Sequence, residues 1–104
     1  MLLKMGVSVR CLKREIRRAL PHIERVYKDV AGHEAVITST TEGTHSPGSL
    51  HYVGQAVDAA LPGTHGMVRK ATATEVLNEL RKELGPNYDV VLERDHIHVE
   101  YDPK

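Results

Sequence analysis

Residues 88–101 read YDVVLERDHIHVEY, and this stretch decides the fold because it sets two strand-like runs on either side of a very short turn. The runs at 88–93 and 96–101 are rich in Val, Ile and Tyr, which favour extended backbone. Only Arg94 and Asp95 separate the two runs. The pattern therefore predicts a β-hairpin.

Two more strands are expected upstream of this hairpin. Residues 34–40 (EAVITST) are short and β-branched, and residues 55–61 (QAVDAAL) follow a loop marked by glycine and proline. Because successive side chains of a strand alternate between its faces, Ala56, Asp58 and Ala60 should share one face.

Two amphipathic helices complete the predicted elements. Residues 10–29 carry apolar side chains at intervals of three and four, and Pro21 is expected to kink or split this helix. A capping box of Thr72 and Glu75 predicts the start of a second helix, which Gly85 should end. The expected core-facing residues of the two helices are Leu12, Ile16, Leu20, Ile23, Val26, Val76, Leu77, Leu80 and Leu84.

The order helix, strand, strand, helix, strand, strand predicts an α+β fold. We expect a single domain over residues 1–104, with a small antiparallel sheet and helices packed on one face. The core must come from Leu, Ile, Val and Tyr, because the chain has no Phe and no Trp.

Composition excludes several partners and locations. The 14 basic and 14 acidic residues give a formal charge of zero, which argues against nucleic acid or an anionic membrane surface as the partner. No signal peptide or membrane-spanning stretch is recognised, so folding in a cytoplasm is expected. Cys11 is the single cysteine and is interpreted as a small buried residue. The early basic residues are interpreted as a solvated helix face: Lys4, Arg10, Lys13, Arg14, Arg17 and Arg18.

Histidine is the unusual feature of the composition, because five of the seven histidines fall after residue 40. His96 and His98 are two positions apart on a predicted strand, so both imidazoles should leave the same face. Asp58 is disfavoured in a strand and needs a partner if it points inward. Together with His51 these residues suit zinc, which takes three protein ligands and keeps one open position in catalytic sites. Surface histidines explain the spacing about equally well, so both interpretations stay open on the residues alone.

Two motifs carry a resemblance to a known family. SLHYVGQAVD at 49–58 resembles the S-x-H-x-x-G-x-A-x-D signature of the zinc D-alanyl-D-alanine carboxypeptidases, and DHIH at 95–98 resembles the family's second motif. The same family includes phage endolysin L-alanyl-D-glutamate peptidases and, more distantly, Hedgehog signalling domains. The resemblance covers roughly residues 34–101. It implies a Hedgehog-like zinc peptidase fold.

Position by position, the resemblance implies that His51, Asp58 and His98 bind one zinc ion. It also implies that Asp95 and His96 are catalytic. Asp95 is the favoured general base, with His96 stabilising the oxyanion, and the two roles could be reversed.

The implied reaction is zinc-dependent cleavage of a peptidoglycan stem peptide, at either a D-Ala-D-Ala or an L-Ala-D-Glu bond. Many carboxypeptidase relatives carry an arginine before the first motif that clamps the substrate carboxylate, but no Arg or Lys lies between Glu34 and Arg69 here. His45 or Arg69 could take that role, and an endopeptidase stays open. Ser49 is a candidate to brace a ligand or the loop, and His45 could brace Ser49.

A second hypothesis is a catalytically inert, zinc-containing module that binds cell wall or forms part of a phage particle. Asp95 and His96 argue against it, because a pure binder has little need of a base beside the metal. We expect a monomer whose partner is a peptidoglycan peptide. Lacking a signal peptide, it would act on the cell wall only after release, as in phage-type lysis.

Overall fold

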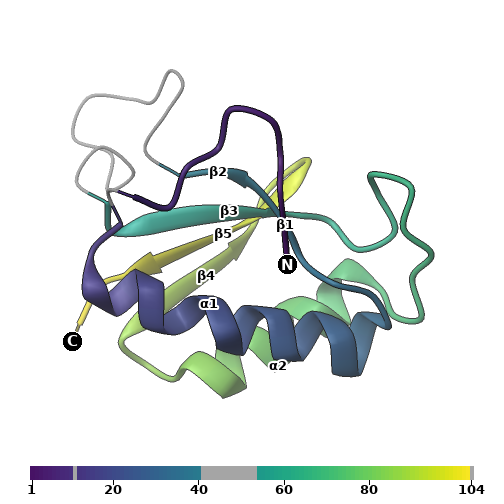
Figure 1. Ribbon diagram of the computed structural model, residues 1–104. Helices are drawn as coiled ribbons and strands as arrows, with labels where there is room; N and C mark the ends of the chain where they lie inside the picture. The colour runs from purple at the N-terminus through teal and green to yellow at the C-terminus, as the bar shows by residue number, and fades with distance from the viewer. Residues whose placement is uncertain (11, 41–53, 104) are drawn as a thin grey trace.

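The computed structural model describes residues 1–10, 12–40 and 54–103, and within them two α-helices accompany a five-stranded sheet (Figure 1). The α+β class and the four predicted strands are confirmed. The elements in chain order are β1 (Leu2–Leu3), α1 (Arg14–Val26), the π-helix η1 (Tyr27–Ala31), β2 (Val36–Ser39), β3 (Ala56–Ala60), α2 (Ala73–Leu84), β4 (Tyr88–Leu92) and β5 (His96–Tyr101).

The sheet has the strand order β1-β2-β3-β5-β4 and is mixed. The predicted hairpin is present, and β2, β3, β5 and β4 are joined by antiparallel pairs. At the other edge, β1 runs parallel to β2, where the Leu2 amide donates to the Ala35 carbonyl at 2.9 Å. The expectation of a purely antiparallel sheet is therefore wrong at this edge. A strand of two residues shows no alternation that sequence analysis can recognise.

The two faces of the sheet have opposite character. Figure 1 shows α1 and α2 lying along the same face, as expected. Val57 and Ala59 of β3, with Ile97 and Val99 of β5, point to that face and are fully buried in the core with the helices. The alternate residues of these strands, including Asp58, project from the opposite face. The predicted alternation in β3 is thus confirmed.

Helix α1 runs without interruption past Pro21, so the predicted split is wrong. Proline removes the amide that would bond the carbonyl of Arg17, four residues earlier. Both residues lie on the exposed side of the helix, where water can satisfy that carbonyl. Ile16 and Ile23 are fully buried before and after the proline, so packing holds both halves against the sheet.

The end of this helical segment connects to the sheet. The π-helix η1 is followed by Gly32, whose φ of 82° is a left-handed conformation that glycine adopts without steric cost. Tyr27 at its start is fully buried, and its hydroxyl donates to the Ala60 carbonyl at 2.7 Å. Burial raises the pKa of Tyr27. This bond ties the helix to the last residue of β3.

Helix α2 begins as the sequence predicts. The Glu75 amide donates to the Thr72 hydroxyl at 3.2 Å, and the Thr72 amide donates to the Glu75 carboxylate at 3.1 Å. This reciprocal pair satisfies two amides that have no partner inside the helix. Gly85 follows the last residue, as expected.

Most side chains of the predicted helix stripes are buried, and Leu20 and Leu84 are half-buried. The early basic residues that the sequence assigns to a solvated face are all exposed. Cys11 lies outside the described residues. Among the helices of the described chain, none is both long and apolar enough to cross a membrane.

Replacing Thr72 by Ala should lower the free energy of unfolding by about 1 kcal/mol, because it removes the side chain that caps α2. Chemical denaturation followed by circular dichroism measures this change. Thr74→Ala is the matched control, since Thr74 is exposed inside the first turn and alanine is the better helix former. Equal losses in the two variants would contradict the assigned cap.

Candidate metal centre and catalytic pair

Asp58 lies at the middle of β3 and is almost entirely buried, with 7% of its surface exposed. An ionised carboxylate is costly to bury unless other groups hydrogen-bond or neutralise it. The pairing of β2 with β3 shifts register here, so that Ser39 stands opposite Asp58. Such irregularities re-aim side chains and occur often beside functional sites. The need for a partner, inferred from the sequence, is met by imidazole groups.

His98 of β5 is the first partner, because the strand register places it directly opposite Asp58. Its Nδ1 lies 3.0 Å from Oδ1 of Asp58, and its Nε2 lies 2.9 Å from Oε1 of Glu100. The hydrogen bond to Asp58, helped by that to Glu100, raises the pKa of His98 against the opposing effect of burial. The imidazole is therefore fixed at both nitrogens.

His96 is the second partner and leaves the same face of β5. Its Nε2 lies 3.5 Å from Oδ1 of Asp58, and its Nδ1 lies 2.6 Å from Oδ1 of Asp95. The contact with the His96 ring holds the pKa of Asp95 below its ordinary value. Asp95 is itself highly exposed, in the turn between β4 and β5. The result is a chain of side chains that runs from the buried Asp58 through His96 to the solvent-exposed Asp95.

A cavity of about 460 Å³ opens onto these residues. Asp58, Asp95 and His96 line one part of it. Its other lining residues are Lys4, Thr38, Ser39, Thr64 and His65. The cavity combines carboxylates, imidazoles, hydroxyls and an ammonium group, which suits a polar substrate better than an apolar one.

The predicted site residues that the structure describes come together. Asp58, His96 and His98 converge from β3 and β5, and Asp95 adjoins them. The other three predicted residues, His45, Ser49 and His51, lie outside the described residues. Gly54, at the end of that segment, has a φ of 76°, which agrees with the expected turn before β3.

Arg69, which the sequence offered as a possible carboxylate clamp, is not among the described residues that line this cavity. Its guanidinium donates to the Ala71 carbonyl at 3.2 Å, and it lines a different hollow with Lys70, Thr72 and Glu75.

Three residues of the site were missed from the sequence. Glu100 could have been found, because H-x-H-x-E places His96, His98 and Glu100 on one face of a strand. Lys4 and His65 carry no local signal, since Lys4 directly follows the very short strand β1 and His65 lies in a turn.

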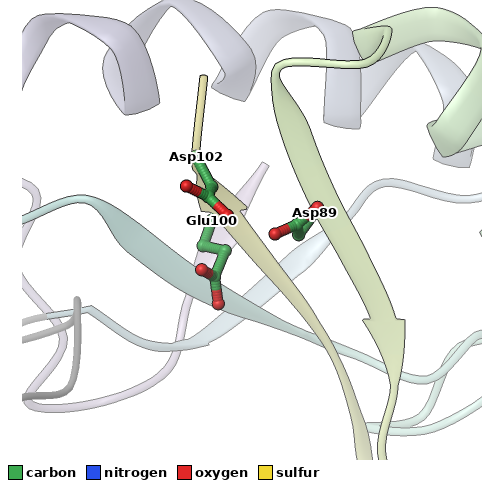
Figure 2. A group of neighbouring side chains, drawn as sticks. All are labelled: Asp89, Glu100 and Asp102. Atoms are coloured by element: carbon green, nitrogen blue, oxygen red, sulfur yellow. The ribbon is translucent and has the colours of Figure 1, made fainter. Parts of the chain in front are cut away.

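An acidic cluster shares Glu100 with the candidate site. Asp89 of β4, Glu100 of β5 and Asp102 each offer a carboxylate oxygen, and these atoms lie within 4.8 Å of one another (Figure 2). Exposed acidic groups of this kind are common without an ion, so the cluster does not indicate a metal site by itself. No other group of three His, Cys, Asp or Glu within the described ranges meets this distance, so Asp58, His96 and His98 alone do not surround one ion.

Comparisons of this chain with protein-family models, curated proteins and solved structures gave no match.

Replacing Asp58 by Asn should lower the pKa of His98 in metal-free protein, and Glu100→Gln should lower it less, because the bond to Asp58 is the larger cause of the shift. NMR titration of the His98 ring in the presence of a chelator measures both changes. A greater effect of Glu100→Gln would contradict this order.

The raised pKa of His98 also determines how the stability of the fold should change with pH. Because the folded pKa of His98 is raised, its protonated form stabilises the metal-free fold below the unfolded value of about 6.5, and that stability is lost as pH rises through the folded value. Asp58→Asn should therefore flatten this part of the stability profile.

Proposed function

We propose that this protein is a zinc-dependent peptidase that cleaves peptidoglycan stem peptides, as the two motifs imply. The observation that carries the proposal is the close approach of Asp58 and His98, which lie 40 positions apart in sequence and 3.0 Å apart in space. Both belong to the ligand set implied by the resemblance, and both lie on the sheet face opposite the helices.

The donor atoms fit a zinc ion. Two ligands bound to one tetrahedral zinc at about 2.0–2.1 Å lie roughly 3.3 Å apart, which is close to the separation of the Asp58 oxygen and the His98 nitrogen. His51 is the proposed third ligand, because the described residues offer no complete set of three around Asp58. Imidazole and carboxylate are both ordinary zinc ligands.

Glu100 strengthens this assignment. A histidine that binds a metal usually donates its second N–H to a carboxylate, which fixes the ring and its tautomer. Nε2 of His98 has this partner in Glu100 at 2.9 Å, while Nδ1 faces Asp58. The proposed ligand is thus already oriented toward the site.

The proposed fold is the Hedgehog-like arrangement of the zinc D-Ala-D-Ala peptidases. Support comes from the antiparallel group β2-β3-β5-β4, with both helices on one face and the polar residues on the other. It also comes from the position of the two motifs, which lie on neighbouring strands although they are far apart in the chain.

In the proposed reaction, Asp95 and His96 move protons as a hydrogen-bonded pair. A bound zinc ion supplies Lewis acidity, which polarises a carbonyl and makes water more acidic. Asp95 accepts a proton from the attacking water and returns it to the leaving amine, and His96 is held between Asp95 and Asp58 where it can stabilise developing charge. Asp95 lines the cavity, so a substrate bound there can bring both the attacking water and the leaving amine to its carboxylate.

The wild-type protein should bind one zinc ion, and Asp58→Ala or His98→Ala should abolish tight binding because each removes a ligand. Isothermal titration calorimetry with zinc measures the stoichiometry and affinity. His22→Ala is the matched control, since His22 is an exposed histidine on α1 bonded to Glu83. Unchanged affinity in the Asp58 and His98 variants would refute the proposed centre.

Digestion of purified peptidoglycan, followed by mass analysis, tests the activity. Released D-Ala would indicate a carboxypeptidase, and new amino termini on D-Glu would indicate an endopeptidase. Asp95→Ala should lower kcat at least 100-fold, with roughly unchanged zinc affinity, because it removes the proposed base but no ligand. The double variant Asp95→Ala, His96→Ala should have a kcat only slightly below that of the less active single variant if the two residues act as a unit. Zinc binding without any product would instead favour an inert module.

A further inference from the structure

We propose that Lys4 and His65 form the subsite that binds a carboxylate of the substrate, in place of the arginine that precedes the first motif in many relatives. This inference rests on the proposed peptidase function and deepens it, because it names the group that the cavity recognises. Both residues line the cavity that also contains Asp58, Asp95 and His96.

The cavity is lined by side chains of both charges. Asp58 and Asp95 each contact His96, and Lys4 is the cavity's only lining residue among the described ones with a fixed positive charge. A substrate carboxylate is repelled by the two acids and attracted by the ammonium group. A peptide would therefore enter with its carboxylate toward Lys4 and its scissile bond toward Asp95.

The backbone of Lys4 is anchored while its ammonium group is available. Its amide donates to the Ile37 carbonyl at 2.9 Å, continuing the pairing of β1 with β2 beside Thr38 and Ser39, which line the same cavity. Within the described residues, no carboxylate forms an ion pair with its ammonium group. Among those residues, Lys4 therefore has no salt bridge to break before it binds a ligand.

His65 is held in an unusual conformation. It is the non-glycine residue with positive φ in the described chain, at 53°, in a turn closed by the Met67 amide bonded to the Thr64 carbonyl at 3.0 Å. The Thr64 hydroxyl also donates to the Leu61 carbonyl at 2.6 Å. Positive φ is uncommon for residues other than glycine, although histidine adopts it more readily than most, and such conformations cluster at functional sites. His65 lines the cavity, where an imidazole can hydrogen-bond a carboxylate.

The test compares zinc-loaded wild type, Lys4→Met and Lys4→Arg on pairs of synthetic stem peptides. One pair ends in D-Ala-D-Ala as free acid or amide, and the other carries D-Glu with its α-carboxylate free or amidated, so the source of the carboxylate is identified. In one of the two pairs, Lys4→Met should raise KM for the free acid roughly tenfold and leave KM for the amide nearly unchanged. Lys4→Arg should keep KM for that free acid close to the wild-type value. Lys82→Met on α2 is the control, since Lys82 is exposed and pairs with Glu79.

His65 is tested by two variants that tolerate positive φ. His65→Gly and His65→Asn should both fold, with melting temperatures at or above that of wild type for the glycine variant, and both should raise KM for the same free acid several-fold. Unchanged KM in these variants would assign His65 to turn structure alone and overturn its place in the subsite.

Binding separates failure of the subsite from failure of the peptidase. Calorimetric titration of the zinc-loaded Asp95→Ala protein with the free-acid and amide peptides reports recognition without turnover. The subsite is supported if the Asp95→Ala protein binds the free acid more tightly than the amide and loses this preference when Lys4→Met is added. This holds even if wild type cleaves nothing. Cleavage by wild type with equal KM for acid and amide overturns the subsite and leaves the peptidase standing. Neither cleavage nor binding overturns both.

Discussion

The contact between Asp58 and His98 is the constraint on which the rest of the site depends. A carboxylate in the middle of a strand is costly unless a partner meets it, and the register of β3 with β5 supplies that partner directly opposite. A slip of one residue would move Asp58 into the helix-facing core and take Val57 out of it. The apolar packing and the polar pair therefore specify the same register, and a protein that folds correctly has also brought together two residues of the proposed site.

The division of the sheet into an apolar and a polar face explains how so small a domain can carry a site. The helices cover one face and supply the core, so the other face of β3 and β5 is left for chemistry. Strands hold side chains more precisely than loops do. The adjacent turn adds Asp95, and more distant segments add Lys4 and His65 around the cavity.

Prediction from the sequence succeeded where the deciding interaction is local. The hairpin at 88–101, the capping box at Thr72 and the alternation around Asp58 each depend on residues close together in the chain, and each is found in the structure. Prediction failed where packing overrode a local preference, and where an element was too short to show a sequence pattern. Pro21 stays inside α1 because buried neighbours hold the helix and water can reach the freed carbonyl, and β1 is too short to show a period.

The sequence by itself determined the fold class, the faces of the strands and the residue types that suit a metal, because periodicity and side-chain chemistry are properties of short segments. Only the tertiary structure decided which of those residues meet. His98 could have faced any carboxylate, and it contacts Asp58 and Glu100 because strand pairing sets them within hydrogen-bonding distance. Lys4 joins the cavity for the same reason: a parallel pair at the sheet edge brings the start of the chain beside β2, and no local pattern encodes a contact between segments so far apart.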